Sequence, residues 1–236
     1  METPLFEEIL NQAGDFNITS VCLTGFGEPL FDPNLIFRVQ RVREVFRKIP
    51  ISIYTNGVLL TEQRINDLVR SGLTDLYVSL NAATATHHEQ IMGIDGKFDQ
   101  IVKMIEYALD IPGLNVCIPV AISPEYIEAQ EVILLQQKFK PKNLFMHYVA
   151  NWGGKLFDLK YKPQHSECRW FDREMYINIK GDVCLCCYDP LGEHAFGNIK
   201  QKPLFDIWWT GRRFFLERIE KEGRGNVAPC NNCTTN

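Results

Sequence analysis

Six cysteines lie in the last 69 residues of this 236-residue chain, and they are the side chains best suited to bind a metal. Cys230 and Cys233 form a CxxC pair, a spacing that suits a metal ion or an iron–sulfur cluster. The other cysteines of this part of the chain are Cys168, Cys184, Cys186 and Cys187. Because such a site takes about four thiolates, we expect Cys168 and one or two of the three central cysteines to complete it.

The start of the chain favours metal binding over disulfide formation. Met1-Glu2-Thr3-Pro4 has no basic-then-apolar pattern, so no secretory signal is visible and we expect a cytoplasmic protein. Clustered cysteines in a reducing cytosol more often bind metals or act in redox chemistry. Spacing alone leaves zinc and iron–sulfur clusters both open, because both use four cysteine ligands. Cys22 and Cys117 lie in apolar runs and are expected to be small buried side chains.

The composition is that of an ordinary globular protein. Hydrophobic residues make up 45% of the chain and charged residues 23%, which excludes a disordered or collagen-like chain. The 25 basic and 29 acidic side chains give a net charge of −4, which gives no indication of a nucleic-acid or anionic-membrane partner. No apolar run approaches the ~18 residues needed to span a bilayer. We therefore expect neither nucleic acid nor a membrane as a partner.

The first 150 residues alternate between short apolar runs and helical patterns, which predicts an α/β fold. The predicted strands are Ile18–Thr24, Ile51–Tyr54, Asp75–Leu80, Asn115–Ala121 and Asn143–Val149. Apolar stripes predict helices over residues 35–46, 61–72, 98–109 and 127–135. Repeated β–α units imply parallel strands, in part of a (β/α) barrel or a doubly wound sheet. Ligands of both architectures bind at the carboxyl ends of the strands.

Polar and glycine-rich segments follow three of these strands. They are Thr24–Leu30, Thr55–Gly57 and Ser79–Ala82. Gly25 and Gly27 allow close approach of the backbone to a ligand, and the Glu28 carboxylate is expected to point into the mouth of the sheet. Each segment taken alone is better explained as a tight turn. Their succession at three strand ends favours a binding site.

The pattern changes after Val149. A turn is predicted over residues 151–154, and a β-hairpin pairs Met175–Ile179 with Asp182–Cys187. Strand alternation in that hairpin places Cys184 and Cys186 on one face and Cys187 on the other. An amphipathic helix is predicted over Pro203–Glu220. We therefore expect two domains, residues 1–154 and residues 155–236.

The order of these segments resembles the radical SAM superfamily. Leu23–Leu30 is similar to the GGE-type motif of those enzymes, and Tyr54–Gly57 and Val78–Ala82 resemble the strand ends that follow it. The C-terminal part resembles the SPASM/twitch auxiliary domains, in which a cysteine precedes a hairpin, a GN pair, a Trp-containing helix and a CxxC. The corresponding residues are Cys168, Ile177–Gly181, Cys186, Gly197-Asn198, Ile207-Trp208, Cys230 and Cys233.

This resemblance implies a partial (β/α) barrel that lacks its first strand, with a small cysteine-rich α+β auxiliary domain. It implies that Glu28 binds the amino group of S-adenosyl-L-methionine (SAM) through a charge-assisted bond. The backbone of Gly25, Phe26 and Gly27 would contact the same group, with Ser79 and Asn81 near the ribose. It further implies an auxiliary 4Fe–4S cluster. Its ligands would be Cys168, Cys186, Cys230 and Cys233, with Cys184 or Cys187 as alternatives to Cys186.

The resemblance also implies an enzyme that uses a 5′-deoxyadenosyl radical to abstract hydrogen from a peptide or a small molecule, with the help of an electron donor. It identifies no catalytic side chain. The family's CxxxCxxC loop, which holds the SAM-cleaving 4Fe–4S cluster, does not occur in the 236 residues. We expect the full-length protein to supply it, and a degenerate family member is the alternative. Two other readings are a non-catalytic peptide-binding or partner-binding relative with a structural iron–sulfur or zinc site, and an unrelated zinc-ribbon α/β protein.

Overall fold

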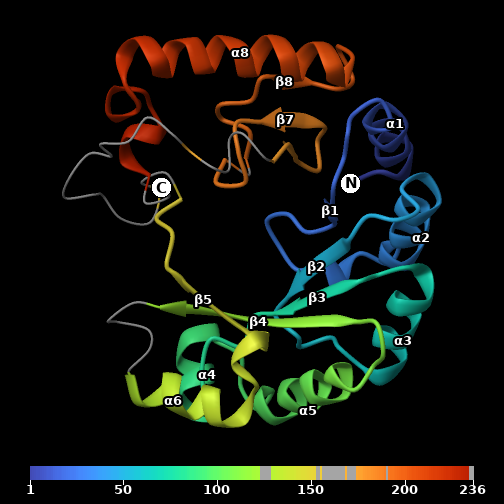
Figure 1. Ribbon diagram of the computed structural model, residues 1–236, viewed down its shortest axis with the longest axis vertical. Coiled ribbons are helices and arrows are strands. Elements are labelled where there is room, and N and C mark those ends of the chain that lie inside the picture. The colour runs from blue at the N-terminus through green and yellow to red at the C-terminus, as the bar shows by residue number, and fades with distance from the viewer. Residues whose placement is uncertain (123–128, 153–154, 156–167, 169–173, 190, 234–236) are drawn as a thin grey trace. The chain divides into compact units, whose positions relative to one another are not determined.

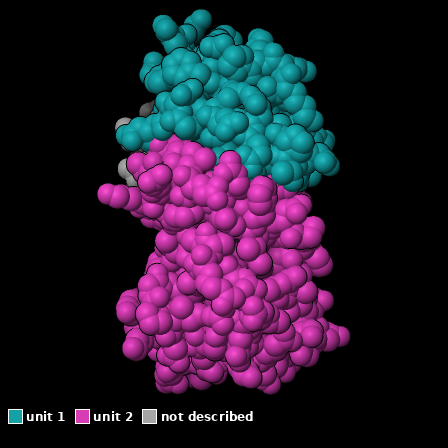
Figure 2. Space-filling model, turned by 90° about the vertical axis from the view of Figure 1, so that its right-hand side faces the viewer, with its two compact units in different colours: residues 1–17, 150–236 teal, residues 18–149 magenta. Residues whose placement is uncertain are grey.

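The computed structural model describes residues 1–122, 129–152, 155, 168, 174–189 and 191–233. It contains two compact units, which Figure 2 colours separately. Unit 2 comprises residues 18–149, and unit 1 comprises residues 1–17 together with residues 150–236. The predicted domains differ from these units in two respects: residues 1–17 belong with the C-terminal part, and the border follows Val149. Within the described residues, no helix is both long and apolar enough to cross a membrane.

Unit 2 is built on a five-stranded parallel sheet in the order β1-β2-β3-β4-β5. The strands are β1 (Val21–Cys22), β2 (Ile51–Thr55), β3 (Asp75–Val78), β4 (Asn115–Ile122) and β5 (Leu144–Tyr148). The helices are α2 (Leu35–Val45), α3 (Glu62–Ser71), α4 (Ala85–Met92), α5 (Phe98–Leu109) and α6 (Ala129–Lys138). The predicted parallel α/β fold is confirmed.

Helices cover one face of this sheet. Figure 1 shows α3, α4, α5 and α6 on the same side of it. Ile51, Ile53 and Leu76 share one face of the sheet and are fully buried, whereas Tyr54, on the opposite face, is 37% exposed. The expectation of buried cysteines is wrong for this reason: Cys22 is exposed and Cys117 is half-buried, because both lie on the other face.

Local signals set the helix boundaries of unit 2. The Thr61 hydroxyl accepts a hydrogen bond from Arg64 N (3.1 Å), and Gly72 ends α3 at a φ of 114°, as its sequence predicts. Helix α4 was not predicted, because its eight residues are mostly polar or small and form no apolar stripe. The first two residues of the predicted helix 127–135 lie outside the described residues.

A buried histidine in α4 gives unit 2 a pH-dependent stability. His88 is fully buried, lies 5.7 Å from Phe98 between ring centroids, and forms no hydrogen bond at either ring nitrogen within the described residues. Burial lowers its pKa below the usual value near 6.5, and the nearby Glu89 carboxylate opposes this only in part. Below pH ~6.5 the unfolded chain therefore takes up a proton that the folded chain refuses.

We accordingly expect the free energy of unfolding to fall as the pH drops from about 6.5 toward the lowered pKa, by up to about 1.4 kcal/mol per pH unit. His88→Phe should remove this slope. Urea unfolding at several pH values measures it, and His147→Phe, which changes an exposed histidine, should keep the wild-type slope. Equal slopes in wild type and His88→Phe would show that another group carries the dependence.

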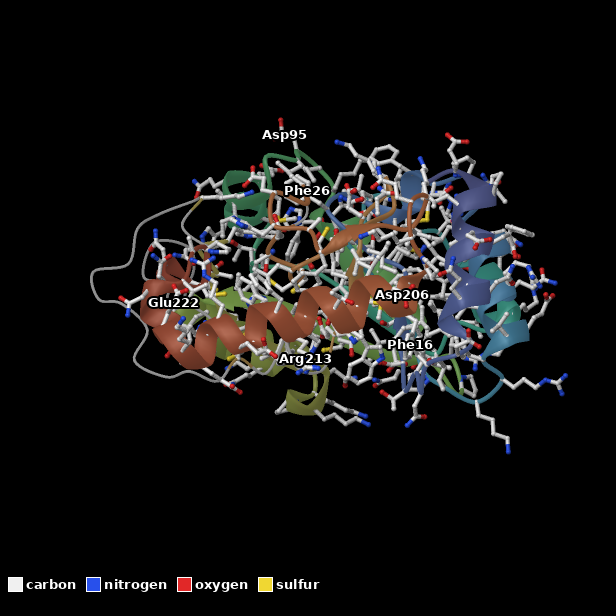
Figure 3. All side chains as sticks on the ribbon, turned by 90° about the horizontal axis from the view of Figure 1, so that it is seen from above. Phe16, Phe26, Asp95, Asp206, Arg213 and Glu222 are labelled. Atoms are coloured by element: carbon white, nitrogen blue, oxygen red, sulfur yellow. The ribbon has the colours of Figure 1, made fainter. Side chains whose placement is uncertain are left out.

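Unit 1 combines α1 (Thr3–Ala13) with a three-stranded antiparallel sheet and a long helix, α8 (Leu204–Glu222). The sheet consists of β6 (Tyr176–Ile177), β7 (Asp182–Cys184) and β8 (Gly197–Asn198). Figure 3 shows Asp206, Arg213 and Glu222 spaced along α8. Leu5 of α1 packs into one core with Val183, Ile199, Leu204 and Ile207, which explains why the first residues belong to this unit.

The predicted hairpin is confirmed, but its second strand is shorter than expected. Tyr176 pairs with Cys184 and Ile177 with Val183, and Gly181 takes a φ of 92° in the turn. Strand β7 ends at Cys184, and Cys186 begins a turn in which its carbonyl accepts a hydrogen bond from Asp189 N (3.0 Å). The strand alternation predicted for Cys184, Cys186 and Cys187 is therefore wrong.

Candidate functional site: strand ends and a thiol cluster

Glu28 lies after β1 and ties two strand ends together. Its Oε1 accepts hydrogen bonds from Leu30 N (3.1 Å) and Thr55 Oγ1 (2.6 Å), and its Oε2 accepts one from Asn56 N (2.8 Å). It also caps the short helix η1 (Pro29–Phe31). A carboxylate has about four acceptor positions, so three internal donors leave Oε2 with room for one more. Glu28 is thus a structural acceptor that retains capacity for a ligand cation.

The glycine-rich segment before Glu28 presents backbone to solvent. Gly25, Phe26 and Gly27 are exposed, and the Phe26 side chain is 71% exposed. Gly27 has a φ of 136°, which favours glycine. Gly57 at the end of β2 has a φ of 80°, and a β-carbon there would lie 2.8 Å from Ile101 Cγ2. Gly27 is required by its positive φ, and Gly57 both by its positive φ and by the lack of space for a β-carbon. Residues 25–27 are exposed and therefore accessible to a ligand.

Ser79 and Asn81 follow β3, and both form hydrogen bonds with neighbouring strands. Ser79 N donates to Thr55 O (2.9 Å), which extends the β2–β3 pairing. Asn81 has a φ of 56°, and its Oδ1 accepts a hydrogen bond from Ala121 N (3.0 Å). Its amide nitrogen faces Met92 Sδ (3.5 Å). The Asn81 side chain therefore links β3 to β4, and the predicted ribose contact stays a prediction.

A histidine–carboxylate contact joins α4 to α6, and the sequence did not predict it. His87 Nδ1 of α4 contacts Glu131 Oε2 of α6. Glu131 Oε1 accepts longer hydrogen bonds from Ala83 N and Thr84 Oγ1, both 3.4 Å. This carboxylate thus joins the segment after β3 to α6. The two partners are 44 positions apart, so no local spacing could have indicated the pair.

Five thiols of unit 1 influence one another electrostatically. The pKa of Cys230 is raised to about 12, chiefly by burial; the charge of Arg224 opposes this rise, and the charges of Cys233 and Cys168 add to it. Burial likewise raises the pKa of Cys187 to about 12, with contributions from Glu174, Cys168 and Cys233. The pKa of Cys186 rises above the usual thiol range through burial and through Cys187, Cys230 and Cys233. Each of these shifts includes the charges of other cysteines of unit 1, and the choice of four ligands among them stays a prediction.

Cys184 has different surroundings. It is fully buried in β7, and its Sγ donates to Asp182 O (3.4 Å). Burial raises its pKa to about 12, and the charges that add to this effect belong to Asp189 and Asp182. No cysteine contributes to that shift. Cys184 behaves as a core residue of the hairpin.

The segment after β5 supports the CxxC loop. Asn151 is fully buried, and its Nδ2 donates to Asn232 O (2.8 Å) in η4 (Cys230–Asn232). Trp152 packs edge-on against Tyr188 at 5.4 Å between ring centroids. Burial and the charge of Cys187 raise the pKa of Tyr188 to about 12. Gly153 and Gly154 of the predicted turn lie outside the described residues.

Asn151→Ala should lower the free energy of unfolding by about 1–3 kcal/mol, because it leaves the Asn232 carbonyl without this buried donor. Thermal unfolding of the metal-free chain measures the change. Asn231→Ala alters the neighbouring, partly exposed amide and is the matched control, with an expected change within about 0.5 kcal/mol. Equal melting temperatures for Asn151→Ala and wild type would show that this hydrogen bond does not stabilise the fold.

The thiols suit an iron–sulfur cluster by their chemistry. All are soft donors in one unit, and the described cysteines are free of disulfides. Within the described residues, no three His, Cys, Asp or Glu side chains converge closely enough to hold a single metal ion. Four soft thiol donors suit an iron–sulfur cluster and zinc alike.

Two sequence families match separate parts of this chain. The Radical SAM superfamily matches residues 2–132, more than half of the chain. The iron-sulfur cluster-binding domain named SPASM matches residues 168–234, which include all six C-terminal cysteines. Proteins of these families bind SAM and 4Fe–4S clusters.

A characterised relative and two solved structures resemble the chain over most of its length. The S-adenosyl-L-methionine-dependent 2-deoxy-scyllo-inosamine dehydrogenase of Niallia circulans is 24% identical over 99% of this chain and 80% of its own length. BtrN, crystallised with AdoMet and 2-DOIA, superposes with a TM-score of 0.68 at 20% identity, covering 100% of this chain and 80% of BtrN.

SuiB of Streptococcus suis, bound to the precursor peptide SuiA, gives a TM-score of 0.69 at 17% identity, over 89% of this chain and 58% of SuiB. The structural likenesses concern the fold, and they agree with the sequence matches. Together with the parallel sheet and the thiol cluster, the match over residues 2–132 leads to one conclusion: this chain belongs to the radical SAM superfamily and carries a SPASM-type domain.

Proposed function

We propose that this chain is the SAM-binding and auxiliary-cluster part of a radical SAM oxidoreductase. Cys168, Cys186, Cys230 and Cys233 would hold an auxiliary 4Fe–4S cluster, and the segment Gly25–Glu28 would receive SAM. The observation that carries the proposal is the match of the iron-sulfur cluster-binding SPASM domain to residues 168–234, which include these four cysteines. When bound, SAM and a reduced iron–sulfur cluster supply a radical that abstracts hydrogen from a substrate.

The geometry around Glu28 supports the SAM side of the proposal. Three internal donors hold the carboxylate in place, so it would meet a ligand ammonium without reorganising. Its remaining acceptor position is on Oε2, and a charge-assisted bond there is roughly twice as strong as a neutral one. The exposed backbone of residues 25–27 adds carbonyl acceptors beside it.

The substrate belongs to one of two chemical classes, small molecules or peptides. The relatives act on both: the Niallia circulans protein is an inosamine dehydrogenase, and SuiB was crystallised with a precursor peptide. The Niallia circulans enzyme aligns with nearly the whole of this chain, which supports testing small hydroxylated rings first. An electron donor and a cytoplasmic location complete the proposal.

The test uses protein expressed from the complete reading frame that contains these residues. After anaerobic loading with iron and sulfide, it is incubated with SAM and dithionite, with or without aminocyclitols or peptides. We expect 5′-deoxyadenosine to form, and to form faster with a substrate of the correct class. Glu28→Gln should weaken SAM binding about tenfold in equilibrium dialysis, whereas Glu62→Gln on α3 should leave it unchanged.

Two results would overturn this proposal. One is a fully loaded protein that binds no SAM and forms no 5′-deoxyadenosine under these conditions. The other is SAM binding that Glu28→Gln leaves unaltered in a folded protein, which would remove the ammonium contact while leaving the family assignment intact.

A further inference from the structure

A buried carboxylate of α6 lies against the start of α4, and both helices cover the same side of the sheet (Figure 1). Glu131 is 9% exposed, and its Oε1 accepts hydrogen bonds from Ala83 N and Thr84 Oγ1, both at 3.4 Å. Its other oxygen, Oε2, contacts His87 Nδ1. Thr84 is the N-cap residue of α4, and its hydroxyl accepts a hydrogen bond from His87 N (3.4 Å). Glu131 thus connects α6 to the N-terminus of α4 through three groups.

The groups that Glu131 contacts continue the segment that follows β3. Ala83 comes two positions after Asn81, whose side chain makes contacts of its own with β4 and α4. Asn81 Oδ1 accepts a hydrogen bond from Ala121 N of β4 (3.0 Å), and its amide nitrogen lies 3.5 Å from Met92 Sδ at the end of α4. Helix α4 is therefore held at its start by Glu131 and contacted at its end by Asn81. Together these contacts fix the segment between β3 and α4.

We propose that Glu131 is a positioning residue for SAM, which fixes the segment between β3 and α4 in the conformation that receives the ribose. This inference rests on the proposed function, because it requires SAM to bind at the strand ends, with Ser79 and Asn81 near its ribose. In this scheme Glu131 does not touch SAM and acts through the segment that does. A loose segment loses conformational entropy when a ligand orders it, whereas a segment fixed beforehand avoids that loss. Removal of the Glu131 carboxylate should therefore weaken SAM binding.

The test measures SAM binding by equilibrium dialysis, with the anaerobically loaded protein expressed from the complete reading frame. Glu131→Ala removes the acceptor of all three groups and should raise the dissociation constant for SAM about tenfold. Glu131→Gln should restore it to within about threefold of wild type, because its carbonyl oxygen still accepts from Ala83 N and Thr84 Oγ1 and its amide can donate to an unprotonated His87 Nδ1. Glu131→Met, whose apolar chain tolerates burial, replaces Glu131→Ala if the latter fails to fold by circular dichroism.

A second buried side chain of unit 2 separates positioning from a general loss of stability. Asn143 is 8% exposed, and its Nδ2 donates to Val116 O (2.8 Å) near the start of β4, at the sheet edge opposite to the one where β3 ends. Asn143→Ala leaves this carbonyl without its buried donor and should lower the urea midpoint to an extent similar to that of Glu131→Ala. It should nevertheless keep the dissociation constant for SAM within about twofold of wild type. Glu106→Gln removes an exposed carboxylate of α5 and should change neither quantity.

Failure of this inference and failure of the proposed function give different results. A loaded wild-type protein that binds no SAM overturns the proposed function and the inference with it. SAM binding by wild type that Glu131→Ala and Glu131→Met leave unaltered overturns the inference alone. Equal weakening by Asn143→Ala also overturns it, because SAM affinity would then follow the stability of unit 2 and not the Glu131 contacts.

Discussion

Replacing Cys186 with alanine should abolish stable cluster binding, whereas replacing Cys184 with alanine should leave it intact. The two thiols are two positions apart; Cys184 is buried and Cys186 is half-buried, and their surroundings differ. The charges of Cys187, Cys230 and Cys233 act on Cys186, whereas those of Asp189 and Asp182 act on Cys184. Loss of one of four ligands removes a bond that holds the cluster, while loss of a core thiol removes only packing.

Iron and sulfide analysis after anaerobic loading measures this difference. We expect about four irons and four sulfides per chain in wild type and Cys184→Ala, and less than a quarter of that content in Cys186→Ala. Cys187→Ala is the informative third variant, because Cys187 is near Cys168 and Cys233 and is the remaining alternative ligand. If Cys186→Ala binds a full cluster and Cys187→Ala binds none, then Cys187, and not Cys186, is the cluster ligand.

Removing the Glu28 carboxylate should destabilise unit 2 by about 2–4 kcal/mol. Glu28→Ala leaves Leu30 N, Thr55 Oγ1 and Asn56 N without their acceptor in partly buried surroundings. Glu28→Gln is not a neutral replacement, because its amide N–H group would face one of these N–H or O–H donors whichever way it turns. We expect it to cost about 1–3 kcal/mol.

Urea unfolding followed by circular dichroism measures these losses. Glu44→Gln removes an exposed carboxylate that pairs with Arg41, and it should stay within about 0.5 kcal/mol of wild type. A Glu28→Ala protein as stable as wild type would show that the three hydrogen bonds add nothing to stability, and Glu28 would then be a ligand-binding residue alone.

The sheet was predictable because its signals are local. Each interior strand is a β-branched or aromatic run bounded by turn residues, and four of the predicted strands match closely. The first strand was predicted as Ile18–Thr24 but pairs only over Val21–Cys22. Strand length depends on pairing with a neighbour, which an apolar run alone does not determine. The same limit explains β7, which ends at Cys184 although the cysteine-rich run continues.

The site was predictable in its residue types and not in its contacts. The CxxC pair and the order of the other cysteines indicate the thiol site, and the match of the SPASM domain to residues 168–234 spans all of them. The structural role of Glu28 depends on Thr55 and Asn56, which lie 27 and 28 positions away, and on the way β1 and β2 end together. Arg224 shows the same limit, because it is a charged residue that folding leaves only 2% exposed.

The measurement that tests the central claim most directly is the metal content of the wild-type chain after anaerobic loading with iron, sulfide and an equal amount of zinc. The claim that Cys168, Cys186, Cys230 and Cys233 hold an auxiliary cluster predicts about four irons and four sulfides per chain, with an EPR signal after reduction. One tightly bound zinc per chain without sulfide would contradict it and make the cysteines a structural zinc site.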